Sequence, residues 1–205
     1  MSESLMRLQQ SESLVVQQKK EWGEILSGWE TRNRYQITSP DGVALYHAGE
    51  VGSGALAVLT RGFLKNKRPF TMEMRDAAGA PAFKVVRPWT WFFSECEIVA
   101  PDGSVLGKVD QRWAWFNRRF TVYDRRGVEV AEIFGPLFHP WTFQLKVGEQ
   151  EVGKITKKWS GLLKEAFTDS DNFMVHFGPQ MDQDLRLVLL GATFLIDFLY
   201  FENRE

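Results

Sequence analysis

The feature that most constrains the fold is a turn signal that recurs along the chain. Five turns rich in Asp and Gly separate short β-forming runs; they lie at residues 40–42, 76–79, 101–103, 124–127 and 148–150. Several runs alternate apolar and polar side chains, as in 120–123 (FTVY) and 143–147 (FQLKV). Tight Asp/Gly turns between alternating runs are typical of β-hairpins. The sequence therefore predicts five hairpins in series, and the even spacing of Gly79, Gly103 and Gly127 indicates a repeated unit.

The length and composition fit one globular domain. The chain has 205 residues, 44% of them hydrophobic and 25% charged, with a formal net charge of −1. We expect residues 1–20 to form a flexible polar tail and residues 21–205 a single domain. The near-neutral charge argues against a nucleic-acid partner. The single cysteine, Cys96, rules out an intrachain disulfide, and residues 1–21 lack a continuous apolar stretch, so we expect a cytoplasmic protein.

Aromatic residues are unusually frequent, with 16 Phe and 8 Trp. In a meander of hairpins the Asp/Gly turns lie at one end of the sheet and the connectors between hairpins at the other. Most of the tryptophans fall in those connectors. The candidates for membrane contact are Trp89, Trp91, Phe92, Phe93, Trp113, Trp115, Phe116, Phe138, Trp141 and Trp159. The alternative is that these rings fold inward and plug the end of the barrel.

Cationic residues stand beside these aromatics, a combination that a lipid headgroup interface favours. In the connectors they are Arg87, Arg112, Arg118, Arg119, Lys157 and Lys158. The candidates for headgroup contact are Arg61, Lys65, Lys67, Arg68, Lys157 and Lys158. The competing interpretation of the run from Arg61 to Arg68 is a solvated charged loop.

A hydrophobic helix is expected at residues 181–201. Residues 185–201 are apolar on nearly every face, which is typical of a helix buried in a core or a membrane. Seventeen helical residues reach roughly 25 Å, less than the ~30 Å of a bilayer core. Five hairpins and a strand near residues 172–177 supply eleven or twelve strands, and a closed barrel of that size needs its interior filled. We therefore favour the helix inside the barrel over a membrane span.

The residues that define this central or transmembrane helix are Leu185, Leu189, Gly191, Phe194, Asp197 and Phe198. Among them Asp197 is the exception, because an unpaired buried carboxylate is costly. Inside the barrel it needs a buried partner or a position near the mouth.

Six segments resemble the phospholipid scramblase family in order and spacing. They are residues 28–35 (GWETRNRY), 68–71 (RPFT), 87–88 (RP), 153–161 (GKITKKWSG), 165–173 (EAFTDSDNF) and 191–198 (GATFLIDF). The resemblance implies a tubby-like fold, a twelve-stranded barrel closed around a hydrophobic helix. It also implies ATP-independent, bidirectional movement of phospholipids between leaflets, which calcium stimulates in the animal members.

The chain departs from the animal scramblases at two places. Their proline-rich N-terminal segment has no counterpart in these 205 residues, so we expect no partner binding through such motifs, and aromatic residues at 88–93 (PWTWFF) stand where they carry an acylated cysteine cluster. We expect interfacial aromatics to replace the lipid anchors, since both place apolar surface at a membrane.

Calcium is the one cofactor with a candidate site. The resemblance places a proposed calcium loop from Asp169, with a second acid at Asp171. A twelve-residue calcium loop carries oxygen ligands at positions 1, 3, 5 and 12 and Gly at 6. Here Phe173, Gln180 and Met174 stand at positions 5, 12 and 6, which favours a polar turn leading into a strand.

Covalent chemistry has no candidate residues. His47, His139 and His176 show no metal-binding spacing, and no phosphate loop or nucleophile elbow occurs. The expected partner is a phospholipid membrane, with no small-molecule substrate identified. The first functional hypothesis is a scramblase, either peripheral on the inner face of the membrane or single-pass. The others are a lipid- or phosphoinositide-binding module without scrambling activity, and a protein-binding scaffold.

Overall fold

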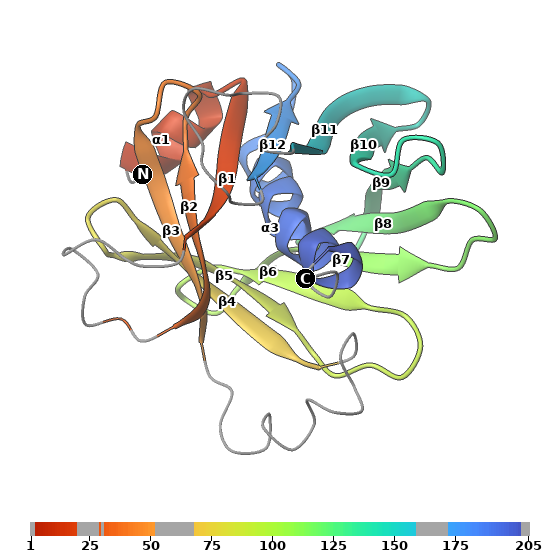
Figure 1. Ribbon diagram of the computed structural model, residues 1–205, viewed down its shortest axis with the longest axis horizontal. Helices are drawn as coiled ribbons and strands as arrows, with labels where there is room; N and C mark the ends of the chain where they lie inside the picture. The colour runs from red at the N-terminus through yellow and green to blue at the C-terminus, as the bar shows by residue number, and fades with distance from the viewer. Residues whose placement is uncertain (1–2, 20–28, 30, 52–67, 159–171, 202–205) are drawn as a thin grey trace.

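The computed structural model describes residues 3–19, 29, 31–51, 68–158 and 172–201 (Figure 1). Within these ranges it contains twelve strands and two helices. The helices are α1 (Glu3–Gln10) and α3 (Gln183–Tyr200). The strands are β1 (Ser13–Lys19), β2 (Arg32–Thr38), β3 (Ala44–Val51), β4 (Phe70–Asp76), β5 (Pro81–Arg87), β6 (Glu95–Val99), β7 (Val105–Arg112), β8 (Arg118–Asp124), β9 (Glu129–Gly135), β10 (Thr142–Val147), β11 (Gln150–Lys158) and β12 (Asn172–Phe177).

The strands close into one antiparallel barrel. Neighbours follow the order β1-β12-β11-β10-β9-β8-β7-β6-β5-β4-β3-β2, and β1 pairs with β2 to complete the circle. Strands β2 to β11 form the five hairpins that the turn signals predict, so the predicted fold class is confirmed.

The geometry of the hairpin turns explains why Asp and Gly recur in the sequence. Each contains a glycine with φ between +58° and +88°, the left-handed region that side chains with a Cβ rarely adopt. In the turn after β8 the Asp124 carboxylate accepts hydrogen bonds from the backbone N–H groups of Arg126 and Val128. Every hairpin also shifts register next to its turn, as expected for a turn followed by a bulge. Because the hairpins follow one another as antiparallel neighbours, all five turns lie at one end of the barrel, called the turn end. The connectors between hairpins lie at the other end, called the mouth.

The structure corrects the expectation that residues 1–20 form a loose tail. Residues 3–10 form α1, and residues 13–19 form β1, the strand that closes the barrel between β12 and β2. Leu8, Leu14 and Val16 are fully buried. One partner of β1, the next strand β2, is near in sequence, but the other, β12 at Asn172–Phe177, lies at the far end of the chain, so the local sequence pattern does not reveal the closing pair.

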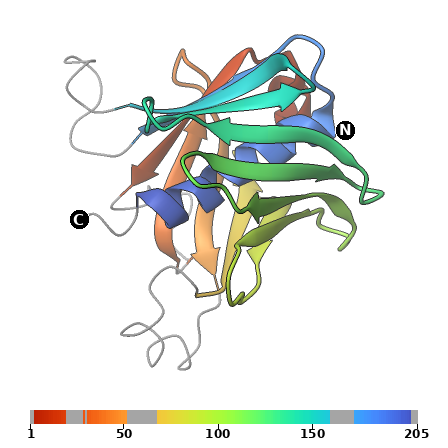
Figure 2. The ribbon, with the colours of Figure 1, turned by 90° about the vertical axis from the view of Figure 1, so that its right-hand side faces the viewer.

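Helix α3 runs through the barrel, as Figures 1 and 2 show. It begins at the turn end, where the Asp182 carboxylate accepts a hydrogen bond from Leu185 N at 2.8 Å. Every residue from Arg186 to Phe198 is buried, which confirms the predicted position inside the barrel. At the turn end Arg186 donates to the carbonyl oxygens of Leu8 and Ser11, tying α1 to α3. Among the residues described, no helix combines the length and hydropathy needed to cross a bilayer.

Candidate functional site: the barrel mouth

Three connectors form an exposed aromatic surface at the mouth, called here the aromatic rim. They are residues 88–94, 113–117 and 136–141, which join β5 to β6, β7 to β8 and β9 to β10. These strands are consecutive neighbours in the barrel, so the connectors form one arc. The exposed apolar side chains on this arc are Trp89, Trp91, Phe92, Phe93, Trp113, Trp115, Phe116, Leu137 and Phe138. Phe92 is 87% exposed and Phe138 89%, so these rings do not plug the barrel.

The tryptophans of the rim are arranged in pairs. The Trp89 and Trp91 rings meet edge to face with centroids 4.4 Å apart, and Trp113 and Trp115 do so at 4.7 Å. Edge-to-face packing is the favoured geometry for aromatic pairs. Each pair therefore presents a rigid apolar surface instead of two independent side chains. The repeated Trp-x-Trp spacing in the sequence is the signal for this pairing.

The mouth is closed from inside by the end of α3 and not by the rim. Trp141, one of the candidates for membrane contact, is half-buried and its ring packs 5.8 Å from that of Phe201. Phe201 also meets Phe173 at 5.7 Å, and Tyr200 meets Phe143 at 5.8 Å. The inward-folding alternative is thus correct for Trp141 among the described candidates.

Four cationic side chains, three from barrel strands and one from just before β4, surround this end of α3. The guanidinium groups of Arg68 and Arg87 each lie 4.7 Å from the Phe198 ring, and Arg118 lies 4.3 Å from Phe143. Lys157 Nζ lies 4.3 Å from the Phe201 ring. No basic residue occupies the last turn of α3 itself. These cations offset the partial negative charge of the helix C-terminus and stack on aromatic faces.

This arrangement corrects two of the headgroup candidates. Arg68 forms a two-pronged ion pair with the buried carboxylate of Glu50, and Lys157 is 6% exposed. Both side chains point into the mouth. The ion pair with Glu50 stabilises Arg68 there, and contacts with aromatic rings stabilise both cations. Arg112 and Arg119 do lie on the exposed outer face, bonded to Thr121 and Glu132 respectively.

Asp197 was expected to have a buried partner or to lie near the mouth, and the structure shows a buried partner. It is 6% exposed, and the Tyr35 hydroxyl donates a hydrogen bond to its carboxylate at 2.7 Å. Among the described residues Glu50 is also a buried acid, and it accepts from Asn33 at 2.7 Å. Both carboxylates are therefore hydrogen-bonded, which buried charges require.

Several predicted residues lie outside the described part of the chain. They are Arg61, Lys65, Lys67, Trp159, Asp169 and Asp171, together with the side chain of Lys158. The calcium site at Asp169 and Asp171 therefore stays a prediction. Within the described ranges, no three His, Cys, Asp or Glu side chains gather where they could hold a metal ion.

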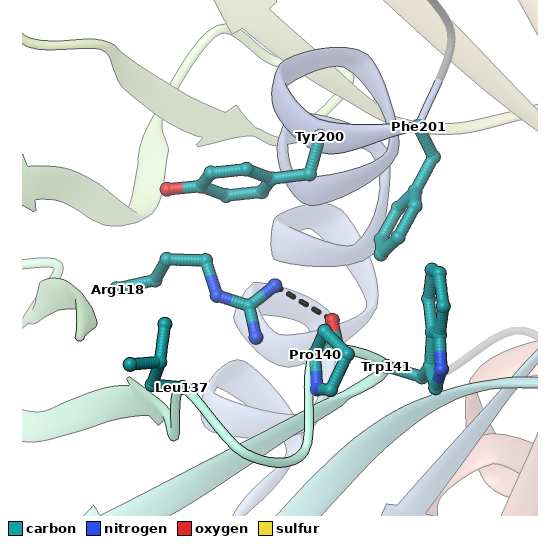
Figure 3. A pocket seen from close by; sticks show the side chains of 6 residues that line it. All are labelled: Arg118, Leu137, Pro140, Trp141, Tyr200 and Phe201. Carbon is teal, nitrogen blue, oxygen red and sulfur yellow. Dashed lines mark hydrogen bonds between the residues drawn. The ribbon is translucent and has the colours of Figure 1, made fainter. Parts of the chain in front are cut away.

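A pocket of about 200 Å³ opens between the rim and the end of α3 (Figure 3). Its lining residues are Arg118, Leu137, Pro140, Trp141, Tyr200 and Phe201. Arg118 is held at the wall by a hydrogen bond to the carbonyl oxygen of Pro140 at 2.7 Å. Burial raises the pKa of Tyr200, which stays protonated at neutral pH. Sequence reasoning did not select Tyr200 or Leu137, because the pocket joins segments some sixty residues apart.

A closed twelve-stranded barrel around an apolar helix defines the tubby-like class of folds. The X-ray structure of an Arabidopsis thaliana protein matches this fold with a TM-score of 0.50 at 13% sequence identity, over 90% of this chain and 93% of that chain. The chain belongs to the Scramblase family, whose sequence signature matches residues 1–203.

Three relatives carry the family's name. Mouse (Mus musculus) phospholipid scramblase 1 is 36% identical over 96% of this chain, and bovine (Bos taurus) phospholipid scramblase 2 is 36% identical over 95%. Human phospholipid scramblase family member 5 is 31% identical over 96%. The aligned regions span 63%, 70% and 76% of those proteins' lengths.

Proposed function

We propose that this protein is a phospholipid scramblase that docks on a bilayer through the aromatic rim and moves phospholipids in both directions without ATP. The observation that carries the proposal is the rim itself. Soluble monomers rarely expose a contiguous apolar surface of this kind, and Trp and Phe are side chains that membrane interfaces favour. Membership of the Scramblase family and the names of the relatives support phospholipid as the lipid and scrambling as the activity.

The position of α3 shapes the mechanism we propose. With the helix inside the barrel, the protein acts as a peripheral membrane protein on the cytoplasmic leaflet. The rim inserts into the headgroup region, and its rigid tryptophan pairs disturb lipid packing there. Lipid movement then follows from a locally perturbed bilayer, with no covalent step on the protein.

The same position favours a second candidate. A barrel that keeps its helix inside can bind lipid without moving it, as a peripheral lipid-binding module. The two candidates agree on membrane binding and differ on transfer between leaflets, so one assay separates them.

The test uses the purified protein reconstituted with liposomes that contain a fluorescent lipid, with reduction of the dye in the outer leaflet by dithionite. Scrambling predicts dye loss well beyond half, whereas protein-free vesicles stop near half. Binding to the vesicles without additional dye loss would support the lipid-binding module instead. A variant with Ser at Trp89, Trp91, Phe92 and Phe93 is the matched control and should show neither binding nor transfer.

Calcium enters the same assay as a variable. We propose that no cofactor is required, so the rate in EDTA should equal the rate in millimolar calcium. A calcium-stimulated rate that the Asp169→Asn and Asp171→Asn substitutions abolish would contradict this and would establish the site that the resemblance implies.

A further inference from the structure

The pocket at the mouth combines a fixed cation with an apolar wall, and it borders the surface proposed to meet the bilayer. Leu137 belongs both to the rim and to the pocket lining. Trp141, Tyr200 and Phe201 supply the wall, and Arg118 stands across from them (Figure 3). A molecule lying at the rim can therefore reach the pocket without leaving the membrane surface.

The positive charges around the pocket favour a ligand with negative charge. Three aromatic rings in a pocket often recognise a quaternary ammonium group. Here two of those rings already carry cations, because Arg118 lies 5.3 Å from the Tyr200 ring and Lys157 lies 4.3 Å from the Phe201 ring. A choline group would meet like charge, whereas a phosphate group would meet opposite charge and the planar donors of an arginine.

Residues 136–141, the connector from β9 to β10, hold the Arg118 side chain in place for such a ligand. The Arg118 guanidinium donates to the carbonyl oxygen of Pro140 at 2.7 Å and lies 4.3 Å over the Phe143 ring. These contacts fix the group at the pocket wall before any ligand arrives, which lowers the entropy lost on binding.

The size of the pocket limits what enters it. A volume of about 200 Å³ is below the 300–1,000 Å³ usual for whole drug-sized ligands. It accommodates a phosphate and the adjoining glycerol carbons but no acyl chain beyond its first carbons. The chains would remain at the rim, in the bilayer.

We propose that this pocket binds the phosphate end of one anionic phospholipid, with Arg118 at the phosphate and Trp141 and Phe201 against the glycerol carbons. The inference rests on the proposed function and assigns a lipid subsite to it. Lipid captured here would be held beside the disturbed bilayer under the rim, at one entry point for transfer.

The test measures binding of a monomeric lipid, so that docking on membranes plays no part. Dihexanoylphosphatidic acid, below its critical micelle concentration, is titrated into the 205-residue protein by calorimetry. Two further titrants separate the sources of affinity: dihexanoylphosphatidylcholine and inorganic phosphate. We expect saturable binding of the phosphatidic acid, at least tenfold weaker binding of the choline lipid and weaker binding still of inorganic phosphate.

Variants then locate the site. Arg118→Gln should weaken phosphatidic acid binding at least tenfold, while Arg119→Gln, on the neighbouring exposed residue that pairs with Glu132, should leave it unchanged. If Arg118→Gln does not fold, as judged by its thermal unfolding, Leu137→Trp fills the pocket from its exposed lip and should block binding. No saturable binding, equal binding of the choline lipid or of inorganic phosphate, or full affinity in the folded Arg118→Gln or Leu137→Trp variant would overturn the inference.

The outcome is separable from that of the proposed function. Lipid transfer by a protein that binds no monomeric phosphatidic acid would overturn only the pocket. Binding in the pocket by a protein that transfers no lipid would overturn only the scramblase activity.

Discussion

Tyr35 and Asp197 lie 162 positions apart in the sequence and meet inside the barrel. Their hydrogen bond ties strand β2 to the last turn of α3. Losing one donor leaves a buried carboxylate less well satisfied, which costs more than the bond itself contributes.

Replacing Tyr35 by Phe removes that donor with little change in shape. We expect the free energy of unfolding to fall by about 1–3 kcal/mol, measured by urea denaturation. Tyr123→Phe is the control, because the Tyr123 hydroxyl bonds Arg112 on the outer face, and it should change stability by under about 0.5 kcal/mol. Equal effects of the two substitutions would show that the Tyr35 hydroxyl does not stabilise α3.

At the scale of elements, the barrel and α3 fit closely because small residues occur where they touch. A Cβ added to Gly191 on α3 would lie 2.8 Å from Ile98 Cγ1 on β6 and 3.1 Å from Val85 Cγ2 on β5. Gly107 on β7 and Gly153 on β11 face Val188 and Leu189 of α3 in the same way. Glycine is unfavourable in a helix interior, so the close approach explains its presence at position 191.

Gly191→Leu should therefore destabilise the protein by about 1–3 kcal/mol through overpacking. The Ile98→Ala substitution makes room on the facing strand, so the double variant should be more stable than the sum of the two single effects predicts. Thermal and urea unfolding of the four proteins measure the coupling. Strict additivity would mean that α3 does not pack against β6 at this point.

Cys96 on β6 reports on whether α3 stays in the barrel. It is fully buried, on the same inward face as Ile98, and burial raises the pKa of its thiol far above neutral pH. Both the lack of access and the scarcity of thiolate predict very slow labelling.

We expect Cys96 to resist maleimide labelling in the folded protein at pH 7.5, both alone and bound to liposomes, and to react fully in urea. The wild-type chain needs no engineering, since Cys96 is its single cysteine. Rapid labelling only after liposomes are added would show that α3 leaves the barrel at the membrane.

At the scale of the whole molecule, the sequence predicts the elements with a local repeating pattern but not the contacts between residues far apart in the chain. The Asp/Gly turns predict the hairpins, and the apolar run at residues 185–201 predicts the helix inside them. The closing strand β1 is not predicted because its partner β12 is remote in sequence. Arg68 and Lys157 look like surface cations in the sequence because the rings they contact, Phe198 and Phe201, come from another segment. The exposed rim was predicted as one of two alternatives, and only the fold decides between them.

The molecule has opposite surfaces at its two ends, and this asymmetry supports the docking we propose. The mouth exposes Trp and Phe, whereas the exposed apolar side chains at the turn end, among the described residues, are Met6 and a few valines such as Val43, Val105 and Val128. A bilayer should therefore bind the mouth and leave the turn end in water.

Flotation with liposomes tests this central claim most directly. The wild-type protein and a control with Ser at Val43, Val105 and Val128 should float with the vesicles. The folded variant with Ser at Trp89, Trp91, Phe92 and Phe93 should remain at the bottom of the gradient. If that rim variant floats as well as the wild type, the aromatic rim is not the membrane-docking surface.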